Sequence, residues 1–211
     1  MAEAMKLYND DMPTFRRENV PARGYTYKDY CSWGEDVRCE LIDGIPYMLA
    51  APTERHQWVV GNIYTQLMVW LDGKPCRAYI APFDVRLFHE LDESDKTVVQ
   101  PDVLVVCDES KLSDGRACRG APDFVVEVVS QGSVKKDFLT KKEKYEEAGV
   151  REYWAIDDEE VYKFELKDGK YGQTVFALSG DLSVDVGVLP GCSISFKSIV
   201  EQALPEASAS V

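Results

Sequence analysis

Two strand-like apolar runs, each with a carboxylate inside it, constrain the fold of this 211-residue chain more than any other feature. The first run is VVQPDVLVV (residues 98–106), and the second is DFVVEVVS (residues 123–130). Such runs are typical of strands that are buried on both faces. Pro101 cannot donate a hydrogen bond to a sheet, and Asp102 is costly to bury unless it is paired or bound to a metal. We therefore expect regular pairing to stop at Pro101 and Asp102 to turn toward a cleft.

The surrounding patterns predict hairpins and helices around these strands. Asp43-Gly44 and Asp168-Gly169 each lie between β-type runs and predict tight hairpin turns. Apolar residues at helical spacing predict a helix after Thr53, which can cap it. Residues 134–148 predict a second helix, because Gly149 is a good terminating residue.

Two further segments complete the expected architecture. Residues 77–88 are expected to form one strand, and residues 107–122 a charged, glycine-containing loop. The order of elements indicates a mixed sheet flanked by helices, an α/β or α+β layer fold with additional β-hairpins.

Length and composition favour one domain. We expect a polar arm at residues 1–24, a single domain at residues 25–204 and a frayed tail at residues 205–211. No signal peptide is expected, and no run of about 18 apolar residues predicts a membrane span. The six cysteines include no Cys-x-x-Cys pair, so we expect reduced thiols in a cytoplasmic protein.

The charge balance limits the possible partners. With 24 Lys and Arg against 37 Asp and Glu, the formal net charge is −13. This argues against a broad nucleic-acid surface, which depends on basic residues that displace counterions. It leaves room for a local basic site, and clustered carboxylates can mark a cation site.

Asp102 and Glu127 are the first candidate site residues. If their strands are neighbours, the two carboxylates can meet, and they must then share a proton or bind a divalent cation. Oxygen ligands of this kind suit Mg²⁺ or Mn²⁺. The alternative is that both side chains point off the sheet edge into solvent.

Three further residues are candidates with open alternatives. Lys141 lies on the same helix face as Tyr145, so it should point inward and need a partner such as a carboxylate or a phosphate. Equally, it can form a salt bridge to Asp137 on a solvated helix. Glu40 is either a further acidic ligand or an exposed cross-strand charge. His56 either contacts substrate or metal, or serves as a local hydrogen-bonding group.

Several ordered motifs together resemble one known family. VVQPDVLVVCD, GAPDFVVEVVS and GVREYWAID, preceded by ELIDGIPYMLAAP, are similar to the Uma-two family of restriction-endonuclease-like proteins. This family belongs to the PD-(D/E)XK nuclease superfamily, and the likeness spans about residues 25–200. The resemblance implies a restriction-endonuclease-like fold.

The resemblance also implies a set of site residues. Asp102 and Glu127 match the family's metal-binding carboxylates, which hold Mg²⁺ or Mn²⁺. The plain superfamily pattern would place a lysine two residues after Glu127, where Val129 stands, but the family moves it into the following helix, where Lys141 matches. Glu40 matches the family's amino-terminal acidic position. His56 matches a histidine often found there.

The implied activity is metal-dependent hydrolysis of phosphodiester bonds in nucleic acid, with DNA foremost. Basic residues near the site can contact the backbone or simply balance neighbouring glutamates; these are Lys135, Lys136, Lys142, Lys144, Arg116 and Arg119. Two other functions remain open, a non-catalytic binding or assembly module and a metal-dependent hydrolase of a small phosphorylated substrate. A homodimer is expected because symmetric dimers are the commonest oligomers.

Overall fold

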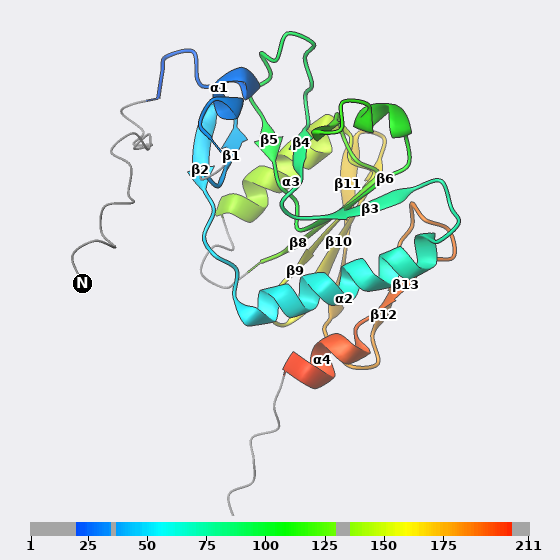
Figure 1. Ribbon diagram of the computed structural model, residues 1–211. Coiled ribbons are helices and arrows are strands. Elements are labelled where there is room, and N and C mark those ends of the chain that lie inside the picture. The colour runs from blue at the N-terminus through cyan, green and yellow to red at the C-terminus, as the bar shows by residue number, and fades with distance from the viewer. Residues whose placement is uncertain (1–19, 35–36, 130–135, 204–211) are drawn as a thin grey trace, which may run out of the picture.

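The computed structural model describes residues 20–34, 37–129 and 136–203 (Figure 1). The predicted tail and most of the predicted arm lie outside these ranges. The described helices are α1 (Tyr27–Cys31), α2 (Glu54–Leu71), the 3-10 helix η2 (Glu109–Leu112), α3 (Lys136–Ala148) and α4 (Lys197–Ala203). Within the described residues, none of these helices has the length and apolar character needed to cross a membrane.

The strands form two main sheets and a small hairpin. The six-stranded sheet has the order β11-β10-β9-β8-β6-β3, and the five-stranded sheet has the order β2-β1-β5-β4-β7. The strands of the six-stranded sheet are β3 (Arg77–Ile80), β6 (Val103–Val106), β8 (Phe124–Val128), β9 (Glu152–Ile156), β10 (Glu160–Lys167) and β11 (Lys170–Ala177). Those of the five-stranded sheet are β1 (Cys39–Ile42), β2 (Ile45–Met48), β4 (Asp84–Arg86), β5 (Val98–Val99) and β7 (Ala117–Arg119). The hairpin pairs β12 (Ser183–Asp185) with β13 (Ser193–Ser195).

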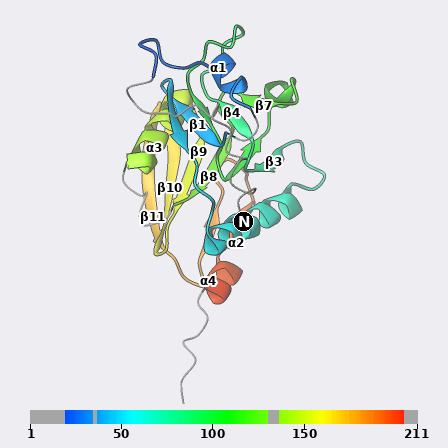
Figure 2. The same cartoon turned by 60° about the vertical axis from the view of Figure 1, so that its left-hand side comes forward.

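The six-stranded sheet is the central layer, and its strands β6, β8 and β9 are buried on both faces. On one face, Val103 and Val105 of β6 pack with α2 and the β12–β13 hairpin. On the other face, Leu104 and Val106 pack against α3 and the five-stranded sheet. Figure 2 shows α2 and α3 on opposite sides of the central strands. This double burial explains why the strands read as nearly continuous apolar runs, and it confirms the expected mixed sheet flanked by helices.

Both predicted hairpins and both predicted helices are present. Ile42 pairs with Ile45, and Lys167 pairs with Lys170, across two-residue turns. Asp43 and Gly44 have φ values of 50° and 78°, the left-handed conformation that such turns require. The predicted helices correspond to α2 and α3.

Two long predicted strands are each divided in the structure. Residues 98–106 contribute β5 to one sheet and β6 to the other, and residues 77–88 likewise contribute β3 and β4 to different sheets. A proline lies in each break, Pro101 and Pro82, where no N–H is available for pairing. The predicted loop at residues 107–122 contains β7, which pairs in parallel with β4. That pairing joins distant parts of the chain and leaves no local signal.

One cysteine prediction is wrong. Cys76 and Cys107 form a disulfide, whereas Cys31, Cys39, Cys118 and Cys192 are free thiols. Arg77 pairs with Val106 between the antiparallel strands β3 and β6. Cys76, which precedes Arg77, therefore lies opposite Cys107, which follows Val106. The two cysteines are 31 residues apart in sequence, and the Cys-x-x-Cys spacing does not detect a pair that is formed by sheet register.

Candidate active site

The candidate site lies where the chain crosses from one sheet to the other. The chain leaves β5 at Val99 and enters β6 at Val103, so residues 100–102 span the junction. The backbone N–H of Gln100 donates to Oε1 of Glu40 at 2.8 Å. Glu40 belongs to β1, the neighbour of β5. The junction therefore places the Glu40 carboxylate next to the segment that carries Asp102.

Asp102 lies opposite Glu127 across the β6–β8 ladder. Val103 pairs with Val126 in this antiparallel ladder, and Asp102 and Glu127 are the next residues beyond that pair. Asp102 Oδ2 also accepts a hydrogen bond from the backbone N–H of Val128 at 2.7 Å. The two strands are neighbours, and Glu127 is buried, so the alternative that both carboxylates point into solvent is wrong.

Lys141 points inward from α3 and joins two carboxylates. Its Nζ lies 2.7 Å from Glu40 Oε1 and 2.8 Å from Glu127 Oε1. The Lys141 side chain is 13% exposed and that of Glu40 is 5% exposed. Both residues are therefore part of a buried charge network, and the alternative of Glu40 as an exposed cross-strand charge is wrong.

Tyr145 extends this network one turn further along α3. Its buried hydroxyl donates to Glu127 Oε1 at 2.6 Å. Oε1 of Glu127 therefore receives donors from both Lys141 and Tyr145. Among the described residues, Oε2 of Glu127 has no hydrogen-bond partner, so this oxygen remains available to a ligand.

Burial and nearby charges perturb the ionisation of this network. Burial, with a smaller contribution from Asp102 and Glu40, raises the pKa of Glu127 to about 7 even though Lys141 opposes the shift. For Lys141, burial lowers the pKa, but the attraction of Glu127 and Glu40 outweighs it and keeps the pKa above its usual value. Lys141 stays charged, while Glu127 is close to its midpoint near neutral pH. A site with three carboxylates and one ammonium has negative charge to offer a cation.

His56 contacts Asp102 from the start of α2. Thr53 caps this helix by accepting a hydrogen bond from the His56 backbone N–H at 3.2 Å. The His56 Nε2 atom lies 3.1 Å from Asp102 Oδ2, and this hydrogen bond is the main reason that the pKa of His56 is raised. His56 Nδ1 is buried without a hydrogen-bond partner among the described residues. His56 is therefore placed to fix the orientation of Asp102.

These side chains line one cavity of about 480 Å³. Its lining includes the charged or ionisable residues Glu40, His56, Asp102, Glu127 and Lys141, and also the consecutive residues Tyr47, Met48, Leu49, Ala50, Ala51 and Pro52. The structure thus brings together five of the residues singled out from the sequence.

Two other candidates, Lys142 and Arg119, are not among the described residues that line this cavity. The Lys142 ammonium lies over the Phe164 ring, 5.2 Å from its centroid. Arg119 Nε donates to Asp114 Oδ2 at 2.9 Å. Lys135 lies outside the described residues. A role for Lys142 and Arg119 in substrate binding stays a prediction.

The donor set fits a hard divalent cation. Asp102 Oδ1 and Glu127 Oε2 have no hydrogen-bond partner in the described part of the chain, and both residues line the cavity. Over the same residues, no group of three or more His, Cys, Asp or Glu side chains is placed so that it could hold a metal ion. Two carboxylates with water and substrate oxygens suit Mg²⁺, which keeps several waters and rarely has an all-protein cage.

The contributions of Tyr145, Tyr47 and the Gln100 backbone were not predicted from the sequence. For Tyr145 a signal existed, because it follows Lys141 by four residues on one helix face. For Tyr47 the two-residue turn at Asp43-Gly44 fixes its pairing with Glu40. For Gln100 no local signal existed, because its contact with Glu40 depends on how β1 and β5 pair.

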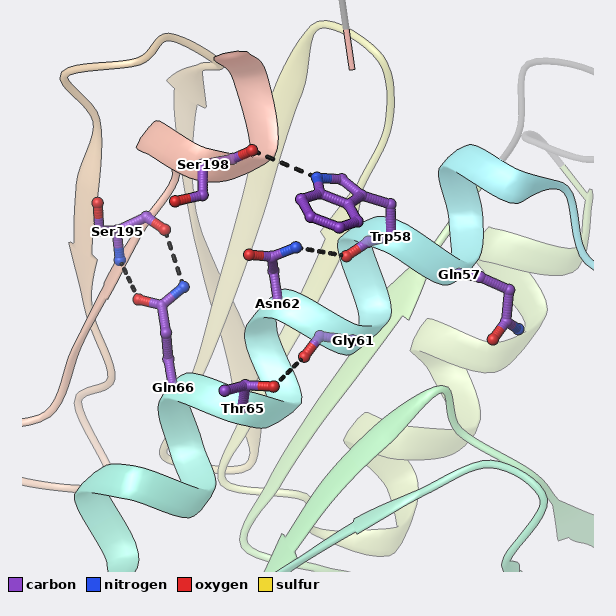
Figure 3. A pocket seen from close by; sticks show the side chains of 8 residues that line it. All are labelled: Gln57, Trp58, Gly61, Asn62, Thr65, Gln66, Ser195 and Ser198. Atoms are coloured by element: carbon purple, nitrogen blue, oxygen red, sulfur yellow. Dashed lines mark hydrogen bonds between the residues drawn. The ribbon is translucent and has the colours of Figure 1, made fainter. Parts of the chain in front are cut away.

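A second hollow, of about 420 Å³, lies between α2 and the carboxy-terminal segment. Figure 3 shows its lining residues, of which Trp58, Asn62, Thr65 and Gln66 bond through their side chains to the protein backbone. Gln66 exchanges two hydrogen bonds with the Ser195 backbone, and Trp58 Nε1 donates to the Ser198 carbonyl at 3.3 Å. Its lining residues carry no charged side chain. These hydrogen bonds join α2 to the carboxy-terminal segment. The hollow lacks the ionisable groups of the first cavity.

Comparisons with known proteins agree with this fold. A structure from Anabaena variabilis ATCC 29413, described as a putative nuclease belonging to DUF820, matches with a TM-score of 0.66 and 19% sequence identity. The match covers 85% of this chain and 99% of that chain, and at this identity it shows a shared fold. No curated protein matched. The Uma2 family model, described as "Putative restriction endonuclease", matches residues 25–197, and the chain therefore belongs to the Uma2 family.

Proposed function

We propose that this protein is a metal-dependent nuclease that hydrolyses phosphodiester bonds of nucleic acid, with DNA the first substrate to test. The observation that carries the proposal is the position of Asp102 opposite Glu127, with Lys141 bonded to Glu127 at 2.8 Å. Phosphodiester hydrolysis needs ligands for a divalent cation and positive charge near the scissile phosphate. The family description of a restriction endonuclease supports the same reaction.

Asp102 and Glu127 would hold Mg²⁺ or Mn²⁺, with Glu40 as a further acidic ligand. When bound, the cation would lower the pKa of an attacking water and neutralise charge on the phosphate. His56 and the Val128 N–H hold Asp102 through one oxygen and leave the other oxygen for the cation.

Lys141 would supply the remaining positive charge. An ammonium has three N–H donors, and Glu40 and Glu127 account for two of them. The third would orient the attacking water or contact a phosphate oxygen. Because both carboxylate partners are rigidly held in sheets, the lysine is positioned before substrate arrives, which reduces the cost of reorganisation during the reaction.

One observation favours a second candidate, a hydrolase of a small phosphorylated substrate. The cavity of about 480 Å³ lies within the range of about 300–1,000 Å³ that is typical of small-molecule pockets. The same carboxylates, cation and lysine would serve that chemistry. The two candidates differ only in what the cavity walls and mouth admit.

The test is a cleavage assay with Mg²⁺ or Mn²⁺ on single-stranded DNA, duplex DNA and RNA, with a panel of small phosphate diesters and monoesters beside them. Asp102→Asn and Glu127→Gln should each lower the rate at least about a hundredfold. Glu152→Gln is the matched control, because Glu152 is also buried and paired with a lysine, Lys163, but does not line the cavity. Turnover of small esters alone would support the second candidate. Metal binding without turnover of any substrate would instead indicate a non-catalytic binding module.

A further inference from the structure

We propose that the cavity accepts an unpaired nucleic-acid strand, one nucleotide at a time, and that the Tyr47 ring stacks on the base beside the scissile phosphate. This inference rests on the proposed nuclease function and names the form of its substrate. It distinguishes the protein from an enzyme that cuts within intact duplex.

Tyr47 is positioned beside the carboxylates by the β1–β2 hairpin. Glu40 and Tyr47 are directly paired in this antiparallel ladder, so their side chains lie on the same face and line the same cavity. Among the described residues, the Tyr47 hydroxyl makes no hydrogen bond and its ring stacks on no other ring. Tyr47 is partly buried against the core and also lines the cavity. An aromatic ring there, next to phosphate-binding chemistry, suits a nucleobase, because every base has a π-face that can stack.

The wall beyond Tyr47 is apolar and exposed. Met48 is 54% exposed, and the consecutive residues from Leu49 to Pro52, which precede α2, also line the cavity. A phosphate backbone gains little from such a wall, whereas a base or sugar packs well against it. The cavity lining thus offers charged groups to a phosphate and a run of apolar residues to a base.

The buried position of the charged groups disfavours duplex as the substrate. The Glu127 side chain is 9% exposed, so a scissile phosphate must enter the cavity to reach its carboxylate. Duplex DNA is stiff, with a persistence length of about 50 nm, and it keeps its bases stacked inside. An unpaired nucleotide rotates freely about its backbone and costs little to extrude. A cavity of about 480 Å³ therefore suits one nucleotide better than a segment of duplex.

The charges around the cavity also favour a single strand over duplex. Among the described residues that line it, the cationic side chains besides His56 are Arg38 and Lys141, and Lys141 already pairs with two carboxylates. Duplex-binding proteins commonly neutralise about six to ten phosphates, so they need a wide basic surface. A single strand held by stacking needs far fewer phosphate contacts.

The test compares one labelled sequence in several forms, with Mg²⁺ or Mn²⁺ present. These forms are a single strand of DNA, the same sequence as RNA, a full duplex, and a duplex with an unpaired bubble at its centre. The single strand and the bubble should be cut at least about tenfold faster than the full duplex. Equal cleavage of the duplex and the single strand would overturn the inference while the nuclease function stands. The DNA and RNA arms identify which strand is preferred.

The role of Tyr47 is tested by substitution together with an abasic strand. Tyr47→Ala should raise KM about tenfold with little change in kcat, and Tyr47→Phe should retain the wild-type KM because the ring remains. On a strand that lacks the base next to the scissile phosphate, wild type and Tyr47→Ala should have the same KM. Tyr64→Ala, at a half-buried tyrosine of α2 that lines neither hollow, is the control. If Tyr47→Ala raised KM equally on intact and abasic strands, that result would contradict stacking.

Binding separates this inference from the nuclease function. If no form is cut, fluorescence anisotropy of the same labelled strands in Mg²⁺ still measures which form binds. Preference for the single strand that depends on the Tyr47 ring would support the inference although the nuclease function had failed. Equal binding of all forms, or no binding, would overturn the inference.

Discussion

Lys141 Nζ lies 2.8 Å from Glu127 Oε1, and both side chains are largely buried. Removing one partner of a buried ion pair leaves an uncompensated charge and typically costs about 3–5 kcal/mol. Because Lys141 also bonds to Glu40, one substitution leaves two carboxylates without their cation. The network therefore couples the stability of the metal-free protein to the candidate site.

Lys141→Met should reduce the free energy of unfolding by about 3 kcal/mol without metal, and Mg²⁺ should restore part of this loss by binding the folded state. Urea unfolding with and without Mg²⁺ measures both effects. Lys163→Met is the matched control, because Lys163 pairs with buried Glu152 at 3.4 Å outside the cavity. It should lose stability without any response to Mg²⁺. Equal Mg²⁺ responses of the two variants would contradict this account.

Tyr145→Phe should weaken metal binding rather than the fold. The Tyr145 hydroxyl, which bonds to Glu127 at 2.6 Å, is one of the two donors that hold Oε1, so its loss leaves the carboxylate less firmly oriented. Groups that orient a metal ligand are typically worth about 10–100-fold in metal affinity or activity. The Mg²⁺ concentration for half-maximal cleavage should therefore rise at least about tenfold.

The control for that variant is Tyr171→Phe, since the Tyr171 hydroxyl donates to the Val150 carbonyl at 2.9 Å and contacts no carboxylate of the site. Its half-maximal Mg²⁺ concentration should equal that of wild type. Identical Mg²⁺ dependence in Tyr145→Phe and Tyr171→Phe would refute an orienting role for Tyr145.

The raised pKa of Glu127 predicts a pH dependence of stability in the metal-free protein. Because the pKa is about 7 in the folded state and 4.5 for an unperturbed glutamate, the folded state holds this proton more tightly. Its contribution is complete below about pH 4.5 and is lost as the pH rises through 7, on the order of 3 kcal/mol in all. Denaturant unfolding from about pH 5 to 8 should show this fall in wild type and a shallower one in Glu127→Gln. Equal slopes would show that the Glu127 carboxyl is not perturbed by folding.

The Cys76–Cys107 disulfide should contribute to stability under oxidising conditions. The two cysteines are 31 residues apart in sequence. A cross-link that closes a loop of about this length typically contributes about 3–4 kcal/mol to the free energy of unfolding. Dithiothreitol should lower the urea midpoint of wild type but leave that of Cys76→Ser unchanged. Alkylation and mass spectrometry of the unreduced protein should find four free thiols. Six free thiols would show that the pair is reduced in solution.

Most of the site was predictable from the sequence because its signals are local. Asp102 and Glu127 interrupt apolar runs, and Lys141 and Tyr145 share a face through helical periodicity. The break at Pro101 follows from its missing N–H. The remaining contacts depend on which distant strands pair. No local pattern reveals that β5 lies beside β1, which places Gln100 against Glu40.

The same limit explains the errors in the fold. The length of an apolar run does not show that a chain changes sheets within it, so the runs at residues 77–88 and 98–106 each predict one strand where the structure has two. Cys76 meets Cys107 only through the β3–β6 register, which the cysteine spacing does not contain.

The most direct test of the central claim is to measure Mn²⁺ occupancy and DNA cleavage in the same titration, with electron paramagnetic resonance for the bound ion. The account predicts that cleavage rises in step with Mn²⁺ binding in wild type, and that Asp102→Asn loses both while Glu152→Gln retains both. Mn²⁺ binding that survives in Asp102→Asn, or cleavage that proceeds without bound Mn²⁺, would contradict a metal site formed by Asp102 and Glu127.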